Sequence, residues 1–323
     1  MATNDRAPPK GAPIPVPAHP HRRREPLPSH HPKPAQDDAL APERLQAILA
    51  SPSYLAADQD VAFLNRDDTR GVRLQLDYLK AELLLEQHRI RHTIVVFGST
   101  RIPEPAAARR QVDRLRESLA GERRDPELRR QLAIAERRLA NSRYYDVARE
   151  FGRLVSVAGH EVQGESMCVM TGGGPGAMEA ANRGAHDAGA KSIGLNIALP
   201  QEQYPNPYVS PELCVTFHYF ALRKLHFLLR ARALVAFPGG YGTFDEVFET
   251  LALVQTRKIK PIPVVLVGEQ FWRRAFDVDF LVDEGVIDAE DKELFWYAET
   301  ADEIWDGIVS WYKLSGGPAP APK

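Results

Sequence analysis

The stretch "ALVAFPGGYGTFDEVFET", residues 233–250, joins an apolar run to a helical pattern through three glycines and a proline. An apolar run that ends in glycine and is followed by a helix is typical of the βα units of a parallel sheet. Glycine at such a junction lets a ligand approach the backbone, because no Cβ is in the way. The stretch therefore predicts a strand, an anion-binding turn and a helix that begins beside the ligand.

The same pattern recurs along the chain from residue 92 onward. Further apolar runs are "TIVVFGS", "MCVMTGGG", "SIGLNIALP", "LCVTFHY" and "IPVVLVG", which begin at residues 93, 167, 192, 213 and 262. We therefore predict an α/β fold, a Rossmann-like doubly wound parallel sheet with helices on both faces. The segment "EIWDGIVSWY", residues 303–312, carries apolar residues on one helical face and predicts a last helix that closes the sheet.

Composition divides the chain into unequal parts. Residues 1–42 hold 11 of the 26 prolines and few large apolar residues, which predicts a disordered tail. Its basic stretch "HPHRRREPLPSHHPK" could contact phosphate or a partner, although a solvated arm is the simpler interpretation. In residues 43–91, leucines at 76, 79 and 83 recur at helical spacing and predict a helical arm packed on the main domain.

The main domain is predicted over residues 92–315, with a second disordered tail at 316–323. Residues 103–158 are rich in Arg, Glu and Ala, and Pro126 interrupts them as a helix-starting residue does. We predict an inserted helical hairpin there, with the charge run "GERRDPELRR" on a solvated helix face.

The overall composition excludes several classes of partner and site. The formal net charge of −2 gives no general attraction for nucleic acid or an anionic membrane. Cys168 and Cys214 lie in apolar runs without metal-ligand spacing, which predicts buried thiols in a reducing compartment and no metal site. No apolar run reaches the length of a membrane span, and the first residues lack a signal-peptide pattern, so we predict a cytoplasmic location.

Three glycine-rich junctions follow predicted strands: "FGSTR" at 97–101, "TGGGPGAMEAANRGA" at 171–185 and "FPGGYGTFDE" at 237–246. In an open parallel sheet, ligands bind outside the carboxyl ends of the strands. The three loops can therefore share one anion, to which the hydroxyls of Ser99 and Thr243 can donate.

Two known phosphate-binding motifs, the dinucleotide-binding motif and the Walker motif, are incomplete in this sequence, and this narrows the identity of the anion. "GGGPGA" satisfies G-x-G-x-x-A, but the next predicted strand, "KSIGLNIALP", lacks the acidic residue that binds ribose in dinucleotide folds. Neither of the longer loops contains the G-K-[ST] of a Walker-type ATPase. The pattern favours the phosphate of a mononucleotide.

Charged residues beside the loops indicate chemistry. We expect Glu246 in the first turn of the helix after the third loop, where it could also be a simple capping partner. Arg223 and Lys224 interrupt an apolar helix, where such a pair is usually on the surface. Together, a carboxylate, a guanidinium and a phosphate cradle are the parts needed to cleave an N-glycosidic bond, because the carboxylate stabilises an oxocarbenium-like sugar.

These motifs resemble the LONELY GUY (LOG) family, cytokinin riboside 5′-monophosphate phosphoribohydrolases, whose hallmark is PGGxGTxxE. The resemblance rests on "GGGPGAMEAANRGA", "RK" and "PGGYGTFDE" and runs from about Thr93 to Tyr312. It implies a hydrolase that splits nucleoside 5′-monophosphates into free base and ribose 5-phosphate without a cofactor. It also implies at least a homodimer, formed through the helix that carries Arg223.

The resemblance assigns the residues as follows. The implied catalytic pair is Arg223 and Glu246. The implied substrate-binding residues are Gly98, Ser99, Gly173, Gly174, Met178, Glu179, Lys224, Gly239, Gly240, Gly242 and Thr243. The family is often labelled lysine decarboxylase, an activity that would need pyridoxal phosphate on Lys224, whose neighbourhood the resemblance assigns to nucleotide binding.

The sequence also departs from the family pattern. Glu179 stands where relatives have glycine, and its bulk and charge near the base favour ordinary nucleotides over those with a large N6 substituent. The insertion and the N-terminal arm are typical of a larger bacterial relative. A nucleotide or molybdenum-cofactor carrier has a similar fold and needs the cradle without the Glu–Arg pair. A sensor of a signalling nucleotide, gated by the arm or the insertion, is compatible with either.

Overall fold

The computed structural model describes residues 16–23, 25–27, 30–121, 125–159, 166–200 and 204–316. The chain divides into two units, Met1–Arg70 and Gly71–Lys323. Parts of the tails predicted at 1–42 and 316–323 lie outside the described residues, and their disorder stays a prediction.

The first unit consists of short helical segments. They are α1 (Ala41–Leu49), α2 (Val61–Leu64) and 3-10 turns at Pro52–Tyr54 and Asp67–Thr69. Asp60 caps α2, because its side chain accepts a hydrogen bond of 2.8 Å from the Phe63 N–H. Among the described residues of this unit, Thr69 alone is buried. These segments therefore form no hydrophobic core of their own.

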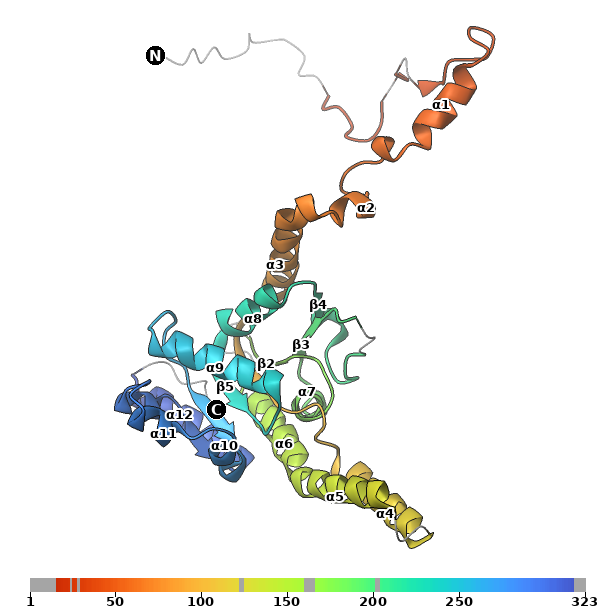
Figure 1. The fold of residues 1–323 in the computed structure, drawn as a ribbon. Coiled ribbons are helices and arrows are strands. Elements are labelled where there is room, and N and C mark those ends of the chain that lie inside the picture. The colour runs from red at the N-terminus through yellow and green to blue at the C-terminus, as the bar shows by residue number, and fades with distance from the viewer. Residues whose placement is uncertain are drawn as a thin grey trace, which may run out of the picture. The chain divides into compact units, whose positions relative to one another are not determined.

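The second unit is built on a seven-stranded parallel sheet with the order β4-β3-β2-β1-β5-β6-β7 (Figure 1). Six of the strands coincide with the six predicted apolar runs. The strands are β1 (Ile90–Phe97), β2 (Ser166–Thr171), β3 (Ser192–Ile197), β4 (Cys214–Phe217), β5 (Ala231–Ala236), β6 (Val264–Val267) and β7 (Trp296–Ala298). The predicted doubly wound fold is confirmed, and β7 is a short edge strand that the sequence did not predict.

The strand order reverses beside β1. From β1 the chain adds β2, β3 and β4 on one side and then β5, β6 and β7 on the other. Val95 of β1 pairs with Met170 of β2 and with Leu234 of β5. The carboxyl ends of β1 and β5 therefore flank the switch point, where open α/β sheets form a binding crevice.

Helices cover both faces of the sheet, because alternate side chains of each strand point to opposite sides. Ile94 and Val96 pack with α6 (Arg143–Ala158), α7 (Ala177–Asp187) and α12 (Ala301–Leu314). Val95 and Phe97 lie in the opposite layer, which holds side chains of α3 (Arg70–Gln87), α8 (Phe220–Leu229), α9 (Tyr241–Gln255) and α10 (Glu269–Ala275). The remaining elements are α11 (Val278–Asp283) and 3-10 turns at Pro211–Leu213 and Ala289–Leu294.

The predicted insertion contains a hairpin and a core helix. Helices α4 (Pro105–Gly121) and α5 (Pro126–Asn141) project from the sheet as a pair (Figure 1). Pro126 starts α5 as predicted, and the pair has its own small cluster of Val112, Leu115 and Ala135. In contrast, α6 lies against the sheet with Phe151 fully buried. The hairpin is therefore α4 and α5, whereas α6 is part of the crossover from β1 to β2.

Helix α3 packs through a different face from the predicted one. Leu76 and Leu83 are 51% and 58% exposed, whereas Ala81 and Leu85 are buried. The leucine spacing correctly predicted a helix but not its packed face. Asp77 and Glu82 add polar contacts on the packed side, and hydrophobic periodicity does not detect such residues.

Two expectations about cysteines and membranes can be compared with the described residues. Cys168 and Cys214 are free thiols, the first buried and the second half-buried. Within the described ranges, no helix is both long and apolar enough to cross a membrane.

Candidate functional site

The three predicted glycine junctions meet at the carboxyl edge of the sheet. The Ser99 N–H after β1 donates to the Pro238 carbonyl after β5, at 3.0 Å. The Ser99 carbonyl accepts a hydrogen bond of 3.2 Å from the N–H of Ala177, at the start of α7. Ser99 therefore links the loops that follow β1, β2 and β5 at the switch point of the sheet.

Two glycines allow these loops to approach one another. A Cβ on Gly98 would lie 2.6 Å from Cβ of Ala177 and 2.9 Å from Cβ of Phe237. Gly176 has a φ of 77°, and a Cβ there would collide with the Ser99 carbonyl. Gly98 therefore allows the loops to pack closely, and its contact with substrate stays a prediction.

The second loop is held by buried polar side chains. Thr171 Oγ1 accepts a hydrogen bond of 2.9 Å from the Gly173 N–H and donates to Asn182 Oδ1 of α7 at 2.7 Å. Gly173 has a φ of 71°, and a Cβ there would strike Asn196 Oδ1. The left-handed conformation of Gly173 is thus fixed from both sides.

Asn206 completes this arrangement from the segment between β3 and β4. Its backbone N–H donates to the Gly173 carbonyl at 2.8 Å. Its Nδ2 donates to the Gly174 carbonyl and to Asn182 Oδ1, both at 3.0 Å. Because Asn206 takes up the carbonyls of both predicted loop glycines, it determines which way their peptide groups point.

The third loop leaves open space at the start of α9. Gly240 is the N-cap residue of α9 and has no side chain to cap the helix. Nothing lies within 4 Å of an added Cβ on Gly240 or Gly242, whereas Thr243 packs over Gly239. Packing within this chain therefore explains why residue 239 is glycine, but it does not explain the glycines at 240 and 242. A helix N-terminus with free N–H groups and open space is suited to an anion.

Arg223 reaches this edge from α8. Its Nε donates to the Leu195 carbonyl of β3 at 2.8 Å. Its Nη2 lies 2.6 Å from the position of a Cβ on Gly172, and Met178 Sδ lies 3.1 Å from the same position. Burial lowers the pKa of Arg223, and the nearby Glu246 opposes this shift. The guanidinium is thus half-buried in a slot that exists because residue 172 is glycine.

Glu246 lies in the second turn of α9, since the helix begins at Tyr241. The expected first-turn position was wrong, and with it the interpretation of Glu246 as a capping residue. Glu246 is 7% exposed, and no hydrogen bond among the described residues reaches its carboxylate. Burial raises its pKa to about 7, and the positive charges of Arg223 and Lys224 partly offset this rise. A buried carboxylate that titrates near neutrality is typical of catalytic sites.

Lys224 is held by two other carboxylates of α9. Its Nζ forms ion pairs with Asp245 at 2.9 Å and Glu249 at 3.1 Å. Burial lowers the pKa of Lys224, but the hydrogen bond that it donates to Asp245 and the negative charge of Glu249 raise it by more. A lysine that forms a Schiff base needs a neutral amine, so these residues do not fit pyridoxal phosphate.

Glu179 is engaged by α6. The Tyr145 hydroxyl donates to Glu179 Oε1 at 2.9 Å, and Arg183 Nη1 lies 3.4 Å from the same hydroxyl oxygen. Burial raises the pKa of Tyr145 to about 12, with Arg183 opposing the rise and Glu179 adding to it. Glu179 is therefore held against the crossover helix and does not extend freely over the loop.

The fold and this edge define a class: a doubly wound α/β protein with a crevice at the carboxyl edge of its sheet, where the buried carboxylate of Glu246 lies near the half-buried guanidinium of Arg223. Within the described residues, no group of three or more His, Cys, Asp and Glu side chains forms a metal site. A family model described as "possible lysine decarboxylase" matches residues 178–308.

Curated relatives carry the LOG name. The chain is 30% identical over 146 residues to a probable cytokinin riboside 5′-monophosphate phosphoribohydrolase LOG4 of Oryza sativa subsp. japonica, covering 44% of this chain and 62% of the relative. It is 27% identical over 150 residues to the LOG3 enzyme of Arabidopsis thaliana, covering 45% and 68%. The predicted resemblance to the LOG family is thereby confirmed over the part of the chain that these matches cover.

Among solved structures, one similar fold is the molybdenum cofactor carrier protein of Chlamydomonas reinhardtii. The two share 20% sequence identity, and the match covers 70% of this chain and 99% of the carrier with a TM-score of 0.37.

Some residues of the site were not predicted. Gly172, Asn182 and Asn206 shape the second loop and the Arg223 slot. Gly172 stands in the predicted motif, so the run of three glycines was an available signal. Asn206 has no such signal, because a side chain that binds backbone carbonyls from a distant loop leaves no local pattern.

Proposed function

We propose that this protein hydrolyses the N-glycosidic bond of nucleoside 5′-monophosphates and releases a free base and ribose 5-phosphate. The observation that carries the proposal is the buried Glu246 beside Arg223, adjacent to the open N-terminus of α9. The similarity to LOG enzymes supports the same reaction class.

In this proposal, the 5′-phosphate binds at the start of α9. The N–H groups near Gly240 and Gly242 donate to the phosphate oxygens, and the helix dipole favours the negative charge. Ser99 and the loop of Gly173 and Gly174 form the opposite wall. Met178 and Glu179 lie beyond them on α7, toward the base.

The proposed reaction transfers the sugar to water. The bond from C1′ to the base nitrogen breaks, its electron pair leaves with the base, and the base takes up a proton. Water adds to C1′ and loses a proton. Ionised Glu246 stabilises the positive charge that develops on the sugar and aligns the water, while Arg223 positions the substrate and offsets negative charge.

A second copy of the chain is part of the proposal. A cavity of about 1370 Å³ lies along α8, and its walls include Leu225, Leu228 and Leu229 of α8 and Leu253 of α9. Leu225 and Leu229 remain 43% and 45% exposed. An apolar surface of this kind on a soluble domain is typical of a protein interface. We propose that the α8 surface pairs with its equivalent in a homodimer.

Other parts of the sequence-based interpretation stay predictions. They are the cytoplasmic location, the absence of a nucleic-acid partner and a role in cytokinin biosynthesis. The preference for ordinary nucleotides over nucleotides with a large N6 substituent is also still a prediction.

The test is chromatography of products after incubation with AMP, GMP, IMP, CMP, UMP and an N6-isopentenyl AMP. We expect free base and ribose 5-phosphate from wild type and a loss of about a hundred- to a thousandfold in Glu246→Gln, typical of removing a main electrostatic group. Binding of a nucleotide without release of base by wild type would contradict the hydrolase and favour the carrier.

A further inference from the structure

We propose that α3 is a positioning element for α8, and that Asp77 of α3 fixes the first turn of α8 and thereby Arg223. This inference rests on the proposed function for the role of Arg223. The claim that Asp77 holds the first turn of α8 can be measured separately. It assigns a role in the site to a helix that lies outside the three glycine loops.

The N-terminus of α8 lacks a cap from its own segment. Tyr219 is the N-cap residue, and its side chain makes no capping hydrogen bond. Asp77 Oδ2 instead accepts hydrogen bonds from the N–H groups of His218 at 2.8 Å and Tyr219 at 2.9 Å. Arg73 Nε also donates to the Tyr219 hydroxyl at 3.1 Å. A carboxylate at a helix N-terminus satisfies free N–H groups and complements the dipole.

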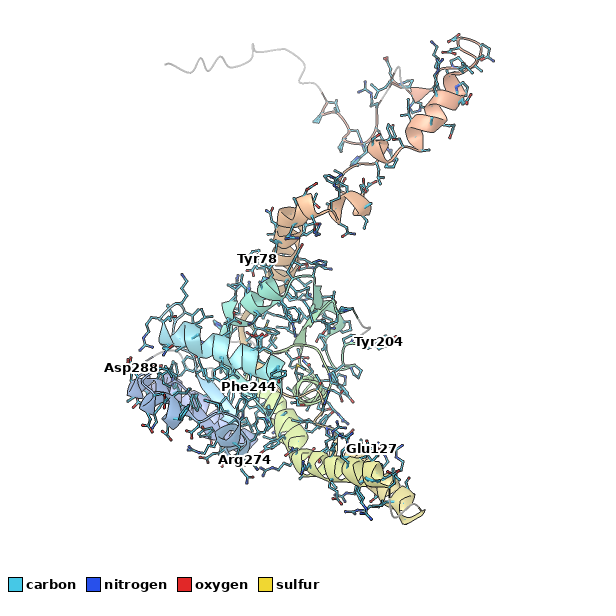
Figure 2. All side chains as sticks on the ribbon, viewed as in Figure 1. Tyr78, Glu127, Tyr204, Phe244, Arg274 and Asp288 are labelled. Carbon is cyan, nitrogen blue, oxygen red and sulfur yellow. The ribbon has the colours of Figure 1, made fainter. Side chains whose placement is uncertain are left out.

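Contacts continue along both helices in the same direction. Tyr78 lies where α3 meets α8 (Figure 2), with its ring 5.1 Å from the ring of His226 and its carbonyl 3.1 Å from His226 Nε2. Near the end of α8, the guanidinium of Arg230 donates to both carboxylate oxygens of Glu82, at 2.7 and 2.6 Å. The Arg230 side chain is 10% exposed, so this pair is well shielded from solvent. Helix α3 therefore holds α8 at its start, middle and end.

The first of these contacts is directly connected to Arg223. The Arg223 N–H donates to the Tyr219 carbonyl at 3.3 Å, which closes the first turn of α8. Tyr219 is also the residue whose N–H binds Asp77. The Arg223 side chain is anchored at its other end by the Leu195 carbonyl. Release of Asp77 would let the first turn of α8 fray and move the guanidinium relative to Glu246.

The experiment compares Asp77→Ala and Asp77→Asn with wild type, and uses Glu86→Ala as a control that removes an exposed carboxylate from the same helix. We expect Asp77→Ala to increase amide exchange at residues 218–223 by about tenfold, as loss of a cap does. We expect its kcat with AMP to fall by about tenfold or more, because small displacements of positioning groups are costly. Asp77→Asn should retain most of the wild-type amide protection and most of the wild-type kcat, since its amide oxygen still accepts hydrogen bonds.

The outcomes are distinct. Unchanged exchange in Asp77→Ala, or increased exchange without a change in kcat, would overturn the proposal, as would an equal effect of Glu86→Ala. If wild type releases no base, the proposed function fails on its own. The role of Asp77 is then decided by AMP affinity, which must fall together with the protection of residues 218–223.

Discussion

A carboxylate with a pKa near neutrality makes the site sensitive to physiological pH. Glu246 has a pKa of about 7 because burial disfavours its charged form. The proposed reaction uses the ionised carboxylate. We therefore expect kcat/KM to rise with pH and to level off above about 7, measured on AMP across pH 5 to 9. A profile that is flat between pH 5 and 8 would assign the charge stabilisation to another group.

The same ionisation is linked to stability. Because the pKa of Glu246 is raised on folding, the folded state binds more protons than the unfolded state between about pH 4.5 and 7. Stability from this group therefore falls as pH rises through that window. We expect Glu246→Gln to be more stable than wild type at pH 8, by up to about 3 kcal/mol, and similar to it at pH 4.5. Urea unfolding at the two pH values measures this difference.

Gly242 offers a test that separates binding from folding. It lies in the first turn of α9 with open space around it. Gly242→Ala should stabilise the helix by about 0.5 to 1 kcal/mol, because alanine is the better helix former. The added methyl group should raise KM for AMP about tenfold or more by obstructing the phosphate. Thermal unfolding and steady-state kinetics check both parts, and an unchanged KM would place the phosphate elsewhere.

At this scale, the sequence predicted residues of local motifs and missed those that act from a distance. "PGGYGTFDE" identified Glu246 and the open glycines because turn chemistry requires particular residues at fixed spacing. Asn206 and Asp77 act on loops and helices far away in the chain. Their partners depend on tertiary packing, which a single sequence does not display.

Among the elements, strands were predicted well because buried parallel strands are continuous apolar runs. The exception, β7, has three residues within an aromatic segment. Helix α3 was correctly predicted as a helix, but the prediction placed its leucines on the packed face, where two of them are in fact exposed. Its contacts with α8 are mainly polar, so the leucine spacing did not identify the packed face. Helix α6 was grouped with the insertion because charge-rich composition does not distinguish a core helix from a projecting one.

The hairpin of α4 and α5 is an element that we expect to be dispensable for folding. Its cluster of Val112, Leu115 and Ala135 is separate from the two large clusters of the sheet. Replacing residues 105–141 with a short Gly/Ser linker should lower Tm by a few degrees at most, as expected for a loss of about 1 kcal/mol or less. Calorimetry and far-UV circular dichroism check this outcome. Failure to fold would show that the hairpin supports α6.

For the whole molecule, the testable property is its oligomeric state. Leu225 and Leu229 line the cavity along α8. Substituting both with glutamate places charges in the proposed interface, at a cost of several kcal/mol in association. We expect a dimer for wild type and a monomer for the double variant in light scattering after gel filtration. Substituting the exposed Leu76 and Leu83 of α3 with glutamate is the matched control.

The central place of β1 in the sheet has a consequence for synthesis on the ribosome. β1 pairs with β2 on one side and with β5 on the other, and β5 is made only after β2, β3 and β4. A nascent chain that ends before β5 therefore exposes one hydrogen-bonding edge of its most central strand. Such an edge is prone to wrong pairing and to aggregation. The Ser99 N–H also cannot bind the Pro238 carbonyl until the loop after β5 has been made. We therefore expect the crevice to be among the last parts of the protein to form.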